Sequence, residues 1–266
     1  MKLPRLSLTR DRIVTLLLCL LVLAGLSLLL YPTVSDRWNS LHQTRAIESY
    51  AVQVAGLDEA EADRIWQAAR RYNAALAARP VQSALTEEQL ADYAAQLDPD
   101  GTGVMGSLEI PRIRCTLPIY HGTDEATLQV AVGHLNWTSL PVGGAGSHCV
   151  LSGHRGLPSA RLFTNLPELE VGDRFYLHIL DRTLTYQVDQ ILTVAPQDTT
   201  ALRIEQGKDY CTLVTCTPYG INTHRLLVRG CRVDGQDQTA ENAARSAQQA
   251  QALSANTERG EADETL

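Results

Sequence analysis

The stretch from residue 212 to residue 230 holds residue types that could form a covalent bond to a peptide. It reads as an apolar strand, a loop rich in turn residues and a second apolar strand. Cys216 ends the first strand beside the loop, and Arg225 opens the second. A guanidinium near a thiol favours the thiolate, and it can also stabilise the oxygen of a carbonyl under attack. The stretch therefore predicts Cys216 as a nucleophile assisted by Arg225.

A second stretch, residues 149–156, supplies a partner for proton transfer. An apolar strand ends there in Ser-Gly, and His154 follows where the strand breaks. Imidazole is the usual proton partner of a thiol nucleophile because its pKa is readily tuned. We therefore predict a catalytic set of Cys216, His154 and Arg225. His224 precedes Arg225, and we expect it to face away because successive strand residues alternate between faces.

Several motifs in order make the chain resemble the sortase family, in particular its class C branch, which polymerises pilins. They include Leu-Glu-Ile-Pro at 108–111, Leu-Pro-Ile-Tyr-His-Gly at 117–122, Leu-Ser-Gly-His-Arg-Gly at 151–156, Thr-Leu-Val-Thr-Cys at 212–216 and the spacing to Arg225. His121 and His134 lie in similar motifs and could line the cleft. The resemblance covers roughly residues 103–233. It implies a closed eight-stranded β-barrel and a membrane-anchored cysteine transpeptidase.

By the same resemblance, the substrate is an LPXTG-like sorting signal on a pilin or surface protein, cut between Thr and Gly. Cys216 would form the acyl-thioester and His154 would act as general acid and base. Arg225 would orient the substrate and stabilise the oxyanion. An amine resolves the thioester, and in the class C branch it is a lysine of the next pilin. This chemistry implies no cofactor and no metal.

Alternatives remain open at this point. A sortase could attach surface proteins to cell-wall peptidoglycan, or an idle barrel could only bind pilins or wall peptides. His148, Cys149 and His154 do not have the spacing of a zinc site, and alternation separates His148 from Cys149. A papain-type protease is disfavoured because its His lies well downstream of a Cys within a recognisable local signature, whereas here His154 precedes Cys216.

The N-terminus predicts a membrane anchor. Residues 1–12 carry four bases and one acid, and residues 13–31 form a leucine-rich run without a charge. That length is close to the roughly 20 residues of a transmembrane helix. The basic flank is expected in the cytoplasm, which places the catalytic part outside the cell with a single pass. A cleaved signal peptide is the competing interpretation.

Residues 32–102 are expected to be mainly helical. An apolar stripe at helical spacing consists of Ile65, Ala69, Tyr72 and Leu76. Thr86 and Gln89 predict a capping box for a short helix. Class C sortases often carry an Asp-Pro-aromatic lid motif around the positions that correspond to 79–88, but this chain lacks it there. The region is therefore a candidate lid without named lid residues.

Residues 103–233 show short apolar runs separated by turn residues, which predicts a mostly β barrel or sandwich. If Cys216 pairs with Arg225, Cys211 and Cys231 lie nearly opposite each other, and we consider a disulfide between them. Residues 234–266 carry seven acids and two bases, which is most of the net charge of −7. This polar tail is expected to be disordered. The sequence shows no basic patch, so nothing in it indicates nucleic-acid binding.

Overall fold

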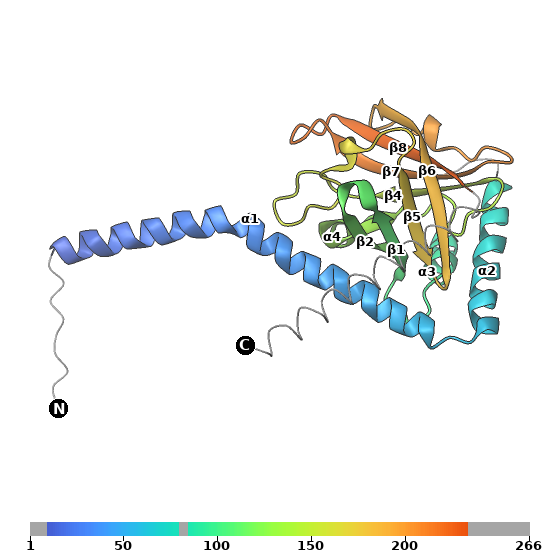
Figure 1. The fold of residues 1–266 in the computed structure, drawn as a ribbon, viewed down its shortest axis with the longest axis horizontal. Coiled ribbons are helices and arrows are strands. Elements are labelled where there is room, and N and C mark those ends of the chain that lie inside the picture. Colours follow the sequence, from blue (N-terminus) through green and yellow to red (C-terminus); the bar gives the residue numbers. More distant parts are fainter. Residues whose placement is uncertain (1–9, 80–84, 234–266) are drawn as a thin grey trace, which may run out of the picture.

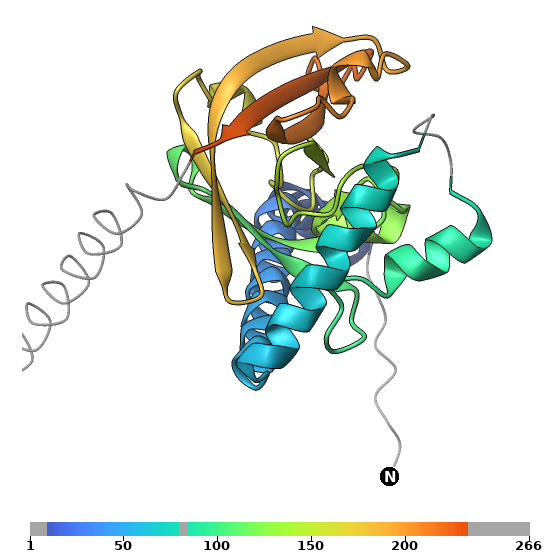
Figure 2. The same ribbon diagram turned by 90° about the vertical axis from the view of Figure 1, so that its right-hand side faces the viewer.

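A computed structural model of the chain describes residues 10–79 and 85–233. The polar tail and residues 80–84 of the candidate lid region therefore lie outside the described residues. Among the described residues, eight strands close into one barrel; α1 passes below it and α2 rises from the end of α1 along another side (Figures 1 and 2). This is the mostly β barrel, preceded by helices, that the sequence predicts.

The strand order around the barrel is β1-β2-β3-β4-β7-β8-β6-β5, and β5 pairs again with β1. Two pairs are parallel, β2 with β3 and β4 with β7, and the others are antiparallel. The strands are β1 (Val104–Ile110), β2 (Cys115–His121), β3 (Val132–His134), β4 (Ser147–Ser152), β5 (Arg174–Ile179), β6 (Arg182–Val194), β7 (Asp209–Thr217) and β8 (His224–Arg232).

Four α-helices accompany the barrel, and a side-chain oxygen caps the start of three of them. They are α1 (Arg10–Ala55), α2 (Glu59–Ala77), α3 (Glu87–Ala94) and the short α4 (Glu125–Val130). The predicted capping box is confirmed, because Thr86 Oγ1 accepts from Gln89 N and the Gln89 side chain accepts from Thr86 N. The predicted stripe on α2 is also confirmed: Ala69, Tyr72 and Leu76 are buried and Ile65 packs against the core.

The predicted anchor and the first soluble helix form one element. α1 runs through Pro32 without ending, and Figure 1 shows that it changes direction part-way along its length. The apolar side chains between residues 13 and 31 are exposed, whereas Tyr50 is buried against the barrel. Tyr50 Oη donates to the carbonyl of Met105 and accepts from the amide of Leu180, which fixes the end of α1 to β1 and to the turn after β5.

The interior of the barrel is filled by side chains that alternate along the strands. β5 shows strict alternation, with Phe175, Leu177 and Ile179 buried. The apolar runs 184–188 and 191–194 are one strand, β6, because the ladder with β8 is interrupted only by a bulge between Val188 and Gln190. The residue at that bulge is Asp189, and in the sequence a polar residue between two apolar runs looks the same as a turn between two strands.

The considered disulfide between Cys211 and Cys231 is wrong, and both cysteines are free. Cys216 does pair with Arg225, but the same register pairs Cys211 with Gly230 and Cys231 with Tyr210. Cys211 therefore lies on the inner face of the barrel and Cys231 on the outer face. The inner neighbour of Cys211 is Cys149, its direct partner on the parallel strand β4.

Candidate active site

Strand pairing brings two of the three predicted site residues together. Cys216 near the end of β7 and Arg225 near the start of β8 are direct partners in the antiparallel ladder. Cβ atoms of such partners are about 4.5–5.5 Å apart on one face of a sheet. Both residues are partly buried. The loop between the strands is closed by the amides of Ile221 and Asn222, which both donate to the carbonyl of Pro218.

The parallel pairing of β4 with β7 brings His154 to the same place. Each β4 residue pairs with the β7 residue 62 positions later, from Ser147 with Asp209 to Ser152 with Val214. The two segments stay in contact beyond the end of β4, because Gly153 N donates to the carbonyl of Val214 and Arg155 Nη1 donates to Thr217 Oγ1 at 3.1 Å. His154 therefore lies beside Cys216. His154, Cys216 and Arg225 form one row across three adjacent chain segments.

The backbone on both sides of His154 is held by short contacts. Gly153 N donates to the carbonyl of Val214 at 3.1 Å, and Thr215 Oγ1 donates to the carbonyl of Gly153 at 2.7 Å. The carbonyl of His154 accepts from the amide of Phe163 at 3.0 Å. A Cβ at position 153 would lie 2.8 Å from the Phe163 ring, so only glycine permits this packing.

A second set of contacts joins the loop after His154 to the loop after Cys216. The guanidinium of Arg155 lies 5.8 Å from the centre of the Tyr219 ring, which is a cation–π distance. Gly156 has φ +81° and packs against the same ring, because a Cβ there would lie 2.9 Å from it. Arg155, Thr217 and Tyr219 are not predicted as site residues from the sequence, although all three stand within two or three positions of a predicted one.

The polar atoms of His154 and Arg225 differ in their hydrogen-bond partners. His154 Nε2 is buried and has no hydrogen-bond partner among the described residues. Arg225 Nη1 donates to the carbonyls of Asn222 and His224 at 3.3 and 3.1 Å, so the loop itself holds the guanidinium. The free imidazole nitrogen can exchange a proton with a bound group, and the guanidinium can donate to an anionic oxygen.

The row continues into an apolar surface on the outside of the barrel. Val214 and Leu227 lie two positions from Cys216 and Arg225 and therefore on the same face. They belong to a small outer cluster that consists of Val150, Leu202, Val214 and Leu227, with Leu135, Trp137, Leu192, Val194 and Ala201 packed against it. This outer cluster provides an apolar floor next to the row.

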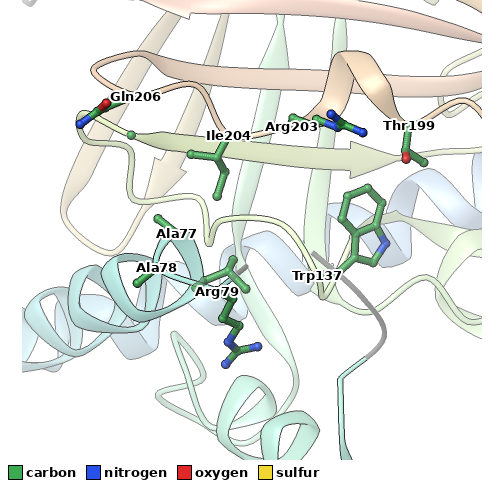
Figure 3. Close-up of a pocket in the computed structure, with 10 residues that line it drawn as sticks. Ala77, Ala78, Arg79, Trp137, Thr199, Arg203, Ile204 and Gln206 are labelled. Carbon is green, nitrogen blue, oxygen red and sulfur yellow. The ribbon is translucent and has the colours of Figure 1, made fainter. Parts of the chain in front are cut away.

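A pocket of about 800 Å³ adjoins the outer cluster through Trp137. Figure 3 shows Ala77 and Ala78, at the end of α2, facing Ile204 of the β6–β7 connection across the pocket. Arg203 and Thr199 lie on the Trp137 side. The pocket therefore has an aromatic wall, aliphatic walls and the cationic groups of Arg79 and Arg203 on its rim.

His121 and His134, which could line the cleft, instead hold α3 on the barrel. The hydroxyl of Tyr93 contacts His134 Nδ1 at 2.9 Å and accepts from the amide of Gly122 at 3.0 Å. His121 Nδ1 and Nε2 contact the carbonyls of Gly103 and Gln96. Burial lowers the pKa of His121 and raises that of Tyr93. His224 is exposed and contacts Thr223 Oγ1.

Comparison with known proteins decides the family. Residues 108–233 match the model of the sortase domain. Sortase D of Bacillus subtilis is 33% identical over 166 residues, which are 60% of this chain and 81% of that protein. The chain belongs to the sortase family. Sortases are cysteine transpeptidases, so this sortase is an enzyme of that type.

Solved structures similar to this sortase include class C enzymes. Sortase C1 of Streptococcus agalactiae has a TM-score of 0.70 at 52% identity and covers 71% of this chain and 98% of its own. Clostridium perfringens sortase C, solved with the C-terminal cell wall sorting motif, has a TM-score of 0.64 at 42% identity, with coverages of 72% and 99%. Sortases act on LPXTG-type sorting signals of surface proteins and pilins.

Proposed function

We propose that this sortase is a membrane-anchored, class C transpeptidase that joins pilins through a thioester on Cys216. The observation that carries the proposal is the row of His154, which follows β4, Cys216 on β7 and Arg225 on β8. A thiol, an imidazole with a free nitrogen and a guanidinium on one face are the groups that acyl transfer requires. The similarity to class C structures at 42–52% identity supports the pilin branch.

The first half-reaction cleaves the sorting signal. The Cys216 thiolate attacks the carbonyl carbon of the Thr–Gly bond, and Arg225 donates to the oxygen as negative charge develops on it. His154 then gives a proton to the leaving glycine amine, and the thioester remains on Cys216. In the second half-reaction His154 removes a proton from the attacking lysine amine, and the thiolate leaves as the new amide bond forms.

The pocket and the outer cluster fit the part of the sorting signal that precedes the scissile bond. Leucine and proline of such a signal are apolar, and the surface beside Cys216 is lined by Val214, Leu227 and Trp137. The related Clostridium perfringens enzyme was solved with a C-terminal cell wall sorting motif. Burial of the apolar side chains of the signal would bind it at about 25 cal/mol per Å².

The N-terminal half of α1 supports a single membrane anchor. Its apolar segment has a mean hydropathy of 3.0, and none of that segment is buried within the structure. The basic residues before it would remain in the cytoplasm, and the barrel would then lie outside the cell.

The acceptor distinguishes pilin polymerisation from wall anchoring. We would incubate the full chain in detergent micelles with an LPXTG peptide and either a lysine-bearing pilin domain or a peptidoglycan cross-bridge amine. The proposal predicts transfer to the pilin lysine, and a Lys→Arg variant of that domain removes the product. Transfer only to the cross-bridge amine or to water would overturn the pilin acceptor, while the thioester chemistry would stand.

A further inference from the structure

A cavity separate from the active site lies where the anchor helix meets the barrel. Its volume is about 770 Å³. One wall is the segment of α1 between Thr33 and Gln43, and the others are the turn 111–114 between β1 and β2 and the loop 161–168. The outer cluster and the 800 Å³ pocket beside it share none of its lining residues.

Positive charge dominates this cavity in a chain whose net charge is −7. Arg37, Arg112, Arg114 and Arg161 line it, against Asp36 and Glu168. Among the described residues, neither Arg37 nor Arg114 forms an ion pair. Arg112 lies 3.7 Å from Glu170 and 3.9 Å from Asp173, which is long for a charge-assisted hydrogen bond. Three guanidinium groups are thus free or loosely paired.

The cavity lies close to the expected membrane surface. The uncharged run of α1 ends at Tyr31, and Gln43 follows it by at most about 18 Å of helix. The polar headgroup layer extends about 5–8 Å beyond the hydrocarbon core, so the cavity begins within this layer at Thr33. Lipid phosphates of the outer leaflet would therefore be within reach of its arginines.

Specific contacts hold the two sides of the cavity together. Asp36 accepts from the amide of Arg161 at 2.9 Å and pairs with its Nε at 3.2 Å. Asn39 Nδ2 donates to the carbonyl of Ser159 at 2.8 Å. In the turn between β1 and β2, Arg114 has φ +50°, a left-handed conformation that is unfavourable for a residue with a Cβ. The cavity is therefore a fixed feature rather than a gap between loosely packed elements.

We propose that this cavity binds an anionic phosphate group, presented by a phospholipid headgroup or by a soluble phosphate ester. Guanidinium groups bind phosphate oxygens with two parallel hydrogen bonds, which makes arginine the preferred residue for such ligands. Arg37 belongs to α1 and Arg114 to the turn between β1 and β2, so a phosphate that bound both would join the helix to the barrel. The proposal concerns binding alone and does not require the pilin acceptor proposed above.

Native mass spectrometry of the full chain, released from a non-ionic detergent, tests the proposal. Phosphatidylglycerol and phosphatidylcholine are titrated separately, and the fraction of protein with one bound lipid is measured. The test variant is Arg37→Gln with Arg114→Gln. The matched control removes two exposed arginines from α2, Arg64→Gln with Arg71→Gln, because Figure 1 shows α2 on the side of the barrel away from the anchor.

The proposal predicts saturable binding of phosphatidylglycerol over phosphatidylcholine, weakened roughly tenfold in the test variant and unchanged in the control. Competition by millimolar glycerol phosphate would identify a soluble ester as ligand, and its failure to compete would identify the lipid. Equal binding of both lipids, or equal loss in both variants, would overturn the site. Should the double variant not fold, Arg37→Gln alone replaces it, and unchanged binding there would also overturn the site.

Discussion

Arg225 is positioned by its own loop, since its guanidinium donates to the carbonyls of Asn222 and His224. No acid pairs with it among the described residues, so its charge is available to a substrate oxygen. Its role in the proposed mechanism depends on the planar, multi-donor geometry of the guanidinium and not on charge alone.

Arg225→Lys is expected to reduce the rate of Cys216 acylation by roughly 10²–10³-fold, the usual effect of losing one oxyanion donor. Stopped-flow or quenched acylation with an LPXTG peptide measures the rate. Iodoacetamide alkylation of Cys216 should continue in the variant, because the thiol stays exposed to small reagents. Arg71→Lys on α2 is the control, and an equal loss in both variants would argue against the proposed role.

The protonation of His148, a single buried side chain, is expected to make the free energy of unfolding depend on pH. Its Nδ1 contacts the carbonyl of Arg203 at 2.9 Å and its Nε2 contacts Thr212 Oγ1 at 2.7 Å, which fits a neutral ring. Burial lowers its pKa below the usual 6.5. The unfolded chain therefore binds the proton more readily than the folded protein, and stability is complete above pH 6.5 and declines as the pH falls below it.

Thermal unfolding of the wild type and of His148→Gln between pH 7.5 and pH 5.5 tests this linkage. The wild type should lose more stability over that range, by up to about 1.4 kcal/mol per pH unit from this one histidine. The variant should be less stable at pH 7.5 but show a shallower pH dependence. Parallel curves for the two proteins would show that His148 does not carry the effect.

At the scale of elements, α3 is attached to the barrel by one phenol. Tyr93 Oη contacts His134 Nδ1 and accepts a hydrogen bond from the amide of Gly122. The Tyr93 ring packs against both His121 and His134. Because these groups are buried, removing the hydroxyl leaves polar atoms without partners. The contact therefore stabilises the segment that connects the helical region to β1.

Tyr93→Phe is expected to lower the free energy of unfolding by about 1–3 kcal/mol. Urea denaturation followed by circular dichroism measures the loss. Tyr120→Phe is the matched control, since no hydrogen bond of its hydroxyl is found in the described part of the chain. A loss in Tyr93→Phe no larger than that in Tyr120→Phe would contradict the attachment of α3 through the Tyr93 hydroxyl.

The sequence predicts elements well where the signal is local. The Thr86 capping box, the α2 stripe and most strand positions follow from residues within a few positions of one another. The continuity of β6 does not, because a bulge and a turn both place a polar residue such as Asp189 between apolar runs. The disulfide prediction failed because a register shift of one residue moves a side chain to the opposite face.

The candidate site also combines residues that local motifs reveal with an arrangement that only long-range strand pairing determines. Cys216, His154 and Arg225 stand in recognisable motifs, whereas their alignment in one row depends on the parallel pairing of β4 and β7. That pairing joins segments 62 residues apart, so no local pattern reveals it. Contacts such as Arg155 with Thr217 depend on the same register and could be found only in three dimensions.

At the scale of the whole molecule, one helix connects the candidate membrane span to the loop that follows His154. Figure 1 shows α1 extending from the anchor along the barrel, and Asp36 and Asn39 contact the loop that follows His154. Those contacts reach Ser159 and Arg161, five and seven positions from His154. α1 therefore restrains the loop that follows His154.

Asp36→Ala with Asn39→Ala is expected to release that loop. Hydrogen exchange of the peptide that covers residues 156–163 should accelerate at least tenfold, because the Arg161 amide loses its acceptor. Acylation of Cys216 should slow as His154 becomes less ordered. Thr44→Ala with Arg45→Ala, on the same helix, serves as control, and unchanged exchange in the test variant would refute the restraint.

Formation of a thioester at Cys216 is the central claim, and intact mass spectrometry tests it most directly. The full chain is incubated with an LPXTG peptide, without an acceptor, and the mass of the protein is read after acid quench. We expect an adduct with the mass of the peptide cut after Thr, located on Cys216, absent in Cys216→Ala and retained in Cys231→Ala. No adduct on a Cys216 that also fails to alkylate, or an adduct that survives in Cys216→Ala, would contradict the claim.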